Sequence, residues 1–268
     1  MIKTVRWLIT ETLQNWQQDV IWVRPQCALN CFGCRCIADT DRSEIALLGG
    51  TPPGYPRTLT DLVEVVRSGQ FFEWHSHARV LNVMGADPLL DPHLMSLLEV
   101  LPEVSRHVRV WTPGVIDDFD WETALRFVVE WVIYLPALNA EMYREITGRD
   151  YADRVLARLE WLHRRGARVQ VAHIPQAATL QDLTDLYDMC RRSGFELRLL
   201  VPQHHDLTPQ GWAYVGRMRR CRGVTWTTVL KPHPHACLAI SPARFGSLVH
   251  LKEVLSQLLA RLGQTYRI

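Results

Sequence analysis

The sequence predicts an α/β fold: a partial, TIM-like (β/α)6 barrel of parallel strands that is open on one side. Two observations lead to this prediction. Short runs of apolar and β-branched residues alternate along the chain with segments of helical periodicity. Helical spacers between strands imply parallel strands joined by right-handed crossovers. Because the alternation supplies about six β–α units rather than the eight of a complete barrel, we expect the sheet to remain open.

Each expected strand is a short apolar run that ends at a polar or turn-forming residue. The six expected strands cover residues 19–24, 80–84, 108–112, 131–135, 169–174 and 197–201, and 224–230 is a further candidate. The expected helices cover 58–68, 91–101, 121–129, 151–165, 179–193, 209–219 and 247–262. Thr58 with Asp61 resembles a capping box, and Gly69 suits the end of the same helix. The turn-rich segment 37–56 is expected to be loop.

Composition and charge narrow the class of protein. The 268 residues show no composition break, so we expect a single domain with a core at about 18–205 and a C-terminal extension at about 206–268. The net charge of +2 is too small to indicate nucleic-acid binding. No stretch approaches the roughly 18 apolar residues of a membrane span, and the N-terminal apolar run is too short for a signal peptide. These features predict a cytoplasmic protein.

Three of the seven cysteines form the most informative pattern in the chain. Cys27, Cys31 and Cys34 follow the first expected strand with CxxxCxxC spacing. The odd number and the clustering argue against a secreted disulfide framework and for metal binding. One loop with this spacing can supply thiolates to three irons of a [4Fe–4S] cluster, which leaves the fourth iron free to chelate an amino and a carboxylate group. Zinc is the alternative, with Cys36 as fourth ligand, but no second ligand pair follows.

The cysteine loop resembles that of the radical S-adenosylmethionine (SAM) superfamily in its spacing and in its position after the first strand of an α/β run. The step Phe32-Gly33-Cys34 is most like the activases of anaerobic ribonucleotide reductases, which are glycyl-radical activases. The resemblance implies a cluster at Cys27, Cys31 and Cys34 that cleaves SAM to methionine and a 5′-deoxyadenosyl radical, which takes a hydrogen atom from a substrate. It also implies an electron donor such as flavodoxin or ferredoxin.

The resemblance further implies SAM-binding residues at the ends of later strands. Gly85, Ala86 and Asp87 stand where the superfamily has a Gly-Gly-Glu turn, whose backbone carbonyls bind the SAM amino group. The other candidates are Thr112, Arg149, His173 and His204. By the same resemblance, Arg149 approaches the SAM carboxylate and His204 contacts the adenosine. Except for Arg149, these positions fall at the C-terminal ends of expected strands, where such folds place chemistry.

Two substrate classes are open at this point. A peptide or protein is favoured, because the loop is activase-like and a laterally open barrel suits a large substrate. A small molecule, such as a nucleoside, sugar or amino acid, is the alternative. A non-enzymatic iron–sulfur or zinc protein would use the same cysteines without needing the Gly85 turn. Cys221 and Cys237, with His233 and His235 between them, could hold a second metal or supply a catalytic thiol, although their spacing fits no established pattern.

Overall fold

The computed structural model describes residues 18–23, 27–29, 31, 45–46, 54, 56–73, 79–202 and 207–229. These residues form an eight-stranded sheet in the order β2-β1-β3-β4-β5-β6-β7-β8. The strands are β1 (Gln18–Val23), β2 (Ile45–Ala46), β3 (Val80–Gly85), β4 (Val108–Thr112), β5 (Glu130–Tyr134), β6 (Arg168–His173), β7 (Glu196–Pro202) and β8 (Val224–Val229). Neighbouring strands from β1 to β8 are parallel, and the short β2 runs antiparallel to β1. The two edge strands do not pair, so the sheet is open, as predicted.

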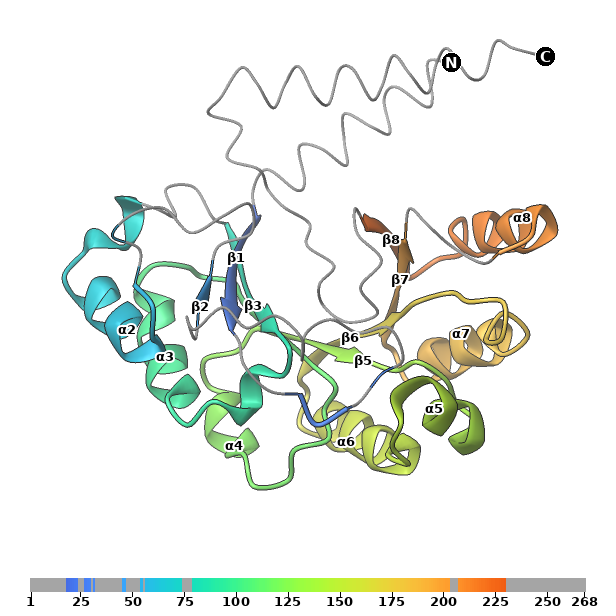
Figure 1. The fold of residues 1–268 in the computed structure, drawn as a ribbon, viewed down its shortest axis with the longest axis horizontal. Helices are drawn as coiled ribbons and strands as arrows, with labels where there is room; N and C mark the ends of the chain where they lie inside the picture. The colour runs from blue at the N-terminus through green and yellow to red at the C-terminus, as the bar shows by residue number, and fades with distance from the viewer. Residues whose placement is uncertain are drawn as a thin grey trace, which may run out of the picture.

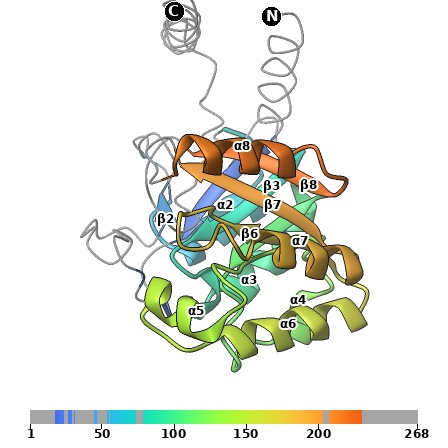
Figure 2. The ribbon, with the colours of Figure 1, turned by 90° about the vertical axis from the view of Figure 1, so that its right-hand side faces the viewer.

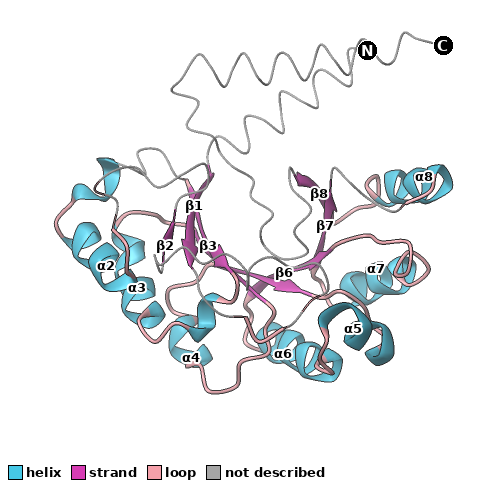
Figure 3. Cartoon of the chain, in the orientation of Figure 1, coloured by secondary structure: helices cyan, strands magenta, loops and turns pink. Residues whose placement is uncertain are grey.

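The helices cover one face of this sheet. They are α2 (Leu59–Arg67), α3 (Leu94–Val100), α4 (Trp121–Ala124), α5 (Ala140–Thr147), α6 (Ala152–Arg164), α7 (Leu183–Arg192) and α8 (Pro209–Met218), with 3-10 turns η1 (Gln70–Glu73), η2 (Pro88–Leu90) and η3 (Leu101–Glu103). Figure 1 shows the sheet as an arc with the helices on its outer side. Figure 2 shows α8, α7 and α6 following one another along the outside, and Figure 3 shows the same separation by secondary structure. The predicted partial α/β barrel is therefore confirmed.

The structure adds the strand β2 and the helix α5 to the predicted elements and confirms one candidate strand. β8 confirms the further candidate strand and brings the parallel strands among the described residues to seven rather than six. β2 lies in the segment expected to be loop. The helix α5 was not predicted, although its signals are present in the sequence. The side chain of Asn139 accepts hydrogen bonds from the backbone N–H groups of Glu141 and Met142, and Gly148 ends the helix with φ 68°.

Three helix boundaries differ from the prediction. α3 begins at Leu94 rather than at residue 91, because Asp91 closes the 3-10 turn η2 before it. α4 is shorter than 121–129, because the backbone N–H of Val129 already donates to the carbonyl of Val108 (2.9 Å) and thus joins the sheet. α7 begins at Leu183, later than predicted, because a turn precedes it. The predicted helix at 247–262 lies outside the described residues. Among the residues that the structure describes, no helix is long and apolar enough to cross a membrane.

Side-chain alternation along the strands separates an apolar outer layer from a charged inner face. On β5, Trp131 packs against Trp121 of α4 with ring centroids 4.8 Å apart, so Trp131 faces the helices. Since successive side chains point to opposite faces of a strand, Glu130 faces the concave side. The register pairs Glu130 with Arg109 on β4 and with Arg168 on β6. These three residues therefore share the concave face.

Candidate functional site

Two of the three predicted cluster ligands lie just beyond the C-terminal end of β1. Val23, the last residue of β1, pairs with Gly85, the last residue of β3. Cys27 is half-buried and Cys31 is 5% exposed, and both pack against the hydrophobic core. The third predicted ligand, Cys34, lies outside the described residues. The cysteine loop therefore starts at the C-terminal end of β1. The turn that follows β3 lies beside the same strand end.

Gly85 allows β3 to approach β1 more closely than another residue would. Its φ is 153°, a conformation that favours glycine, and an ideal Cβ would lie 1.7 Å from the carbonyl oxygen of Val23. Because the clash would be with backbone, no side-chain rotation could relieve it. The backbone N–H of Ala86 instead donates to the same Val23 oxygen (3.3 Å). The predicted turn is thus fixed against the strand from which the cysteine loop departs.

Asp87 is buried at the start of this turn, with 2% of its surface exposed. Its Oδ1 accepts hydrogen bonds from the Thr112 hydroxyl (2.8 Å) and from the backbone N–H of Leu89 (3.3 Å). The Thr112 oxygen accepts in turn from the N–H of Gly114 (3.0 Å), which orients the hydroxyl. The predicted residues Gly85, Asp87 and Thr112 therefore come together where β3 and β4 end.

The second oxygen of Asp87, Oδ2, is buried and has no hydrogen-bond partner among the described residues. Burial raises the pKa of Asp87 to about 7, although hydrogen bonds from Thr112 and Leu89 oppose the shift. An unpartnered buried carboxylate is costly, and a positively charged ligand group would remove much of that cost. The arrangement therefore fits a ligand ammonium group.

Tyr143 of α5 is a second buried polar group without a hydrogen-bond partner among the described residues. Its side chain is fully buried, and its hydroxyl has no hydrogen-bond partner in the described part of the chain. Burial and then the negative charges of Cys31 and Cys27 raise the pKa of Tyr143, and Asp87 adds to the shift. The charges of the two cysteines and of Asp87 therefore act on this phenol in the same direction as its burial.

His173 lies at the end of β6, where either a core histidine or a site residue is consistent with the sequence. It is 1% exposed, and its Nδ1 lies 3.0 Å from the carbonyl oxygen of Leu135. A carbonyl can only accept, so Nδ1 carries the hydrogen and Nε2 accepts from the Thr179 hydroxyl (3.3 Å). Burial lowers the pKa of His173 to about 4, so the ring is neutral. Both ring nitrogens are engaged, which favours a packing role over ligand contact.

The other two candidates do not join the cluster around Asp87 in the described structure. The side chain of Arg149 is exposed, just past the end of α5. His204 lies outside the described residues. Their predicted roles toward SAM therefore stay predictions.

Within the described ranges, no three His, Cys, Asp or Glu side chains gather into a metal site. The predicted set falls partly outside these ranges, because Cys34 is not described. The same holds for the second group considered from the sequence. Cys221 lies half-buried on the turn after α8, whereas Cys237, His233 and His235 are outside the described residues.

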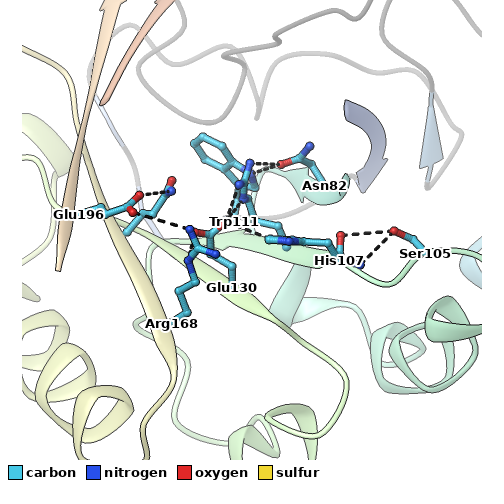
Figure 4. A network of polar contacts seen from close by, with 9 residues as sticks. Asn82, Ser105, His107, Trp111, Glu130, Arg168 and Glu196 are labelled. Carbon is cyan, nitrogen blue, oxygen red and sulfur yellow. Dashed lines mark hydrogen bonds and ion pairs between the residues drawn. The ribbon is translucent and has the colours of Figure 1, made fainter. Parts of the chain in front are cut away.

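A second group of buried polar residues, missed by sequence reasoning, lies on the concave face (Figure 4). Glu130 is fully buried, forms an ion pair with Arg109, and has its Oε1 3.1 Å from the Nε of Arg168. His107 Nε2 lies 3.3 Å from Glu130 Oε2. The inner-face cluster is defined here as Asn82, His107, Arg109, Trp111, Glu130, Arg168, Gln170, Glu196 and Arg198.

Amide groups connect the charged members of the inner-face cluster. The Oδ1 of Asn82 accepts from Trp111 Nε1 (2.9 Å) and from Arg109 Nη1 (3.3 Å). The Nε2 of Gln170 donates to Glu196 Oε2 (2.8 Å). The cluster thus joins side chains from five neighbouring strands, β3 to β7, into one polar network.

Glu130 is ionised within this network. Burial alone would raise the pKa of Glu130, but the opposing charges, led by Arg109, hold it below its ordinary value. The sequence signal that could have revealed the cluster is a period of two. Arg109 and Trp111 alternate with valines on β4, as Arg168 and Gln170 do on β6.

Comparison with curated proteins finds a distant relative, whereas no family model matches the chain. A probable GTP 3′,8-cyclase of Methanococcus vannielii (strain ATCC 35089) is 23% identical over 199 residues, which is 70% of this chain and 62% of the relative. The chain therefore spans less than two thirds of this relative.

Solved structures with the same fold superpose on most of this chain. SuiB of Streptococcus suis bound to S-adenosylmethionine superposes with a TM-score of 0.58 at 14% identity, over 79% of this chain and 50% of SuiB. Methylornithine synthase (PylB) superposes with a TM-score of 0.55 at 15% identity, over 91% of this chain and 81% of that protein. At these identities the similarity establishes the fold: an open α/β barrel.

Proposed function

We propose that this chain is an enzyme of the radical SAM superfamily, the family that the cysteine loop predicts and that the distant relative and the shared fold support. Cys27, Cys31 and Cys34 would hold a [4Fe–4S] cluster. When bound, the cluster supplies the electron that cleaves SAM into methionine and a 5′-deoxyadenosyl radical, which abstracts a hydrogen atom from the substrate.

One observation carries this proposal: a buried carboxyl oxygen without a partner lies on the turn that adjoins the cysteine loop. SAM is an amino acid derivative, and its ammonium group supplies both the positive charge and the hydrogen bond that Asp87 Oδ2 lacks among the described residues. Thr112 orients the carboxylate through Oδ1. Gly85 keeps the turn against β1, so that the carboxylate and the cysteine loop stay close.

The remaining SAM contacts are assigned by the resemblance alone. Ala86 follows the glycine with a small side chain that leaves room for a ligand beside the backbone. Arg149 is proposed to approach the SAM carboxylate from its exposed position after α5, and His204 to contact the adenosine. His173 is proposed to support the ends of β5 and β6 through its hydrogen bonds to Leu135 and Thr179.

The substrate is proposed to be a peptide or protein, of the activase or peptide-modifying type. SuiB, which shares the fold, has been solved bound to its precursor peptide SuiA. The second candidate is a small molecule. Methylornithine synthase supports it, because this chain covers 81% of that protein, more than it covers of SuiB.

We propose flavodoxin or ferredoxin as electron donor and the cytoplasm as compartment, since both donors operate there.

The test is SAM cleavage by the reconstituted protein. The full chain is loaded with iron and sulfide without oxygen, SAM and dithionite are added, and 5′-deoxyadenosine is quantified. We expect 5′-deoxyadenosine from the wild type and none from Cys34→Ala. Cys190→Ala serves as the matched control, because it makes the same substitution at a buried thiol on α7 and should behave as the wild type.

The alternative readings give different results in the same experiment. A zinc protein would contain zinc and no iron after purification. A non-enzymatic iron–sulfur protein would load the cluster but bind no SAM. In our account, Asp87→Asn keeps the iron content of the wild type but lowers its affinity for SAM roughly tenfold or more. A loaded cluster with unchanged SAM affinity in this variant would remove Asp87 from the site.

A further inference from the structure

The inner-face cluster contains one more positive charge than negative charge. The guanidinium groups of Arg109, Arg168 and Arg198 face the carboxylates of Glu130 and Glu196. Arg109 pairs directly with Glu130, and Arg168 lies between both carboxylates, 3.1 Å from one and 3.7 Å from the other. Arg198 forms no direct ion pair with either carboxylate among the described residues, although the charges of Glu130 and Glu196 act on it.

Arg198 reaches across the concave side of the sheet. It lies on β7 and is 7% exposed, and its guanidinium carbon is 5.4 Å from the centroid of the Trp111 ring on β4. In a flat sheet, three strand spacings would separate β7 from β4 by about 14 Å. The contact therefore depends on the curvature of the sheet, and it places the guanidinium on the inner side of the arc.

Two hydrogen-bond groups at this position are buried and unused. The Nε of Arg198 and the hydroxyl of Thr225 have no hydrogen-bond partner among the described residues. The register pairs Arg198 on β7 with Thr225 on β8, so both side chains point to the same face. A buried guanidinium without a direct ion pair is costly to a fold. Here burial and the charge of Arg109 lower the pKa of Arg198 to about 9, against the opposing charges of Glu130 and Glu196.

We propose that Arg198 and Thr225 bind a carboxylate or phosphate group of the substrate on the concave face of the sheet. A guanidinium beside a hydroxyl is a donor set that matches the oxygens of either anion. The inference rests on the proposed function, because it assigns an anionic group to the substrate of the same enzyme. A peptide can carry such a group as an acidic side chain, and a small molecule as a carboxylate or phosphate.

The experiment measures anion binding by thermal unfolding of the reconstituted full-length protein. Melting temperatures are recorded against concentration of succinate and of inorganic phosphate, with chloride at equal ionic strength as the reference. Arg198→Met removes the charge, Arg198→Lys keeps it, and Thr225→Val removes the hydroxyl. Arg164→Met is the matched control, because it makes the same substitution on the exposed end of α6.

We expect succinate or phosphate to raise the melting temperature of the wild type and of Arg164→Met. In Arg198→Met the concentration for half of this effect should rise roughly tenfold or more, with smaller rises in Arg198→Lys and Thr225→Val. In chloride, Arg198→Met should melt no lower than the wild type, because a buried charge without a direct ion pair has been removed.

Two results would overturn the proposal. Equal anion responses in the wild type and Arg198→Met would show that Arg198 binds no anion. A melting temperature several degrees lower in chloride, or failure of the variant to fold, would show that Arg198 has a structural role instead. Formation of 5′-deoxyadenosine in the same preparations separates this inference from the proposed function. If the wild type responds to anions but cleaves no SAM, the proposed function fails while the anion site stands.

Discussion

Two buried carboxyl groups in this molecule have opposite electrostatic environments. Glu130 on the concave face is 0% exposed, yet its pKa lies below the ordinary value, because neighbouring charges led by Arg109 outweigh burial. Asp87 at the end of β3 is 2% exposed, and burial raises its pKa to about 7. The charges beside Glu130 belong to arginines, whereas Asp87 receives only neutral donors, from Thr112 and Leu89.

In our account, this difference reflects two roles: Glu130 stabilises the fold, and Asp87 binds a ligand. The chain supplies the counter-charge of Glu130 itself, so this group contributes to stability without any ligand. At Asp87 burial destabilises the charged form of the carboxyl group, and one of its oxygens has no partner among the described residues. Perturbed, unsatisfied groups of this kind concentrate at functional sites. Each variant below tests one side of this contrast.

Glu130→Gln should have the largest effect on stability. It leaves Arg109 buried without its counter-charge, which should lower the free energy of unfolding by about 3–5 kcal/mol. Chemical denaturation of both proteins measures the difference. Glu122→Gln is the control, because Glu122 pairs with Arg165 on the exposed surface and its loss should change stability little. A loss below about 1 kcal/mol for Glu130→Gln would contradict a structural role for this pair.

Gly85→Ala should have the next largest effect. The added Cβ meets the Val23 carbonyl, so the turn after β3 must move, at a cost of about 2–4 kcal/mol. SAM affinity should fall with it, because Asp87 follows the displaced glycine. Gly166→Ala is the matched control: its φ is +70° and no atom lies within 4 Å of the added Cβ. Calorimetric titration with SAM and thermal unfolding should both separate the two variants; equal behaviour would refute the close approach.

Asp87 should make stability depend on pH in the opposite sense from a paired carboxylate. Its ordinary pKa is 3.8 and its folded pKa is about 7, so the folded state holds a proton that the unfolded state releases. The stability contribution of Asp87 is therefore present below pH 3.8 and is lost as pH rises to about 7. The slope is about 1.4 kcal/mol per pH unit across this interval. Asp87→Asn should remove this slope of the free energy of unfolding against pH. The same slope in the variant and the wild type would show that Asp87 is not buried as an uncharged carboxyl.

Thr112→Val should have the smallest effect. The hydroxyl lowers the pKa of Asp87 through its hydrogen bond, so its removal should raise that pKa further. The lost hydrogen bond should cost about 1 kcal/mol in the free energy of unfolding. Carbon-detected NMR titration of the Asp87 carboxyl in the wild type and the variant measures the shift directly. A lower pKa in the variant would mean that Thr112 does not orient this group.

The sequence predicted the strand ends better than the contacts between strands. Gly85, Asp87 and Thr112 come together because parallel strands end at one edge, and that follows from the alternation of strands and helices. The ion pair of Glu130 with Arg109 did not follow, because it depends on register between strands separated by a helix. The two-residue β2 and the short α4 likewise depend on tertiary pairing rather than on local pattern.

His173 also shows that contacts between strands cannot be predicted from the local sequence. The position of His173 at the end of β6 was predicted, but the sequence could not decide between a core histidine and a site residue. The hydrogen bonds to Leu135 and Thr179 involve neighbours that only the folded sheet brings within reach. A residue type at a strand end therefore predicts proximity to the site, and the partners of its polar atoms decide whether it is available to a ligand.

The most direct test of the account is the electron paramagnetic resonance spectrum of the reduced, reconstituted protein, recorded with and without SAM. We expect a [4Fe–4S] signal that SAM shifts in the wild type and a similar signal that SAM shifts only at much higher concentration in Asp87→Asn. The SAM response of the control Cys190→Ala should equal that of the wild type. A reduced cluster in the wild type whose spectrum does not change with SAM would contradict the assignment of this site.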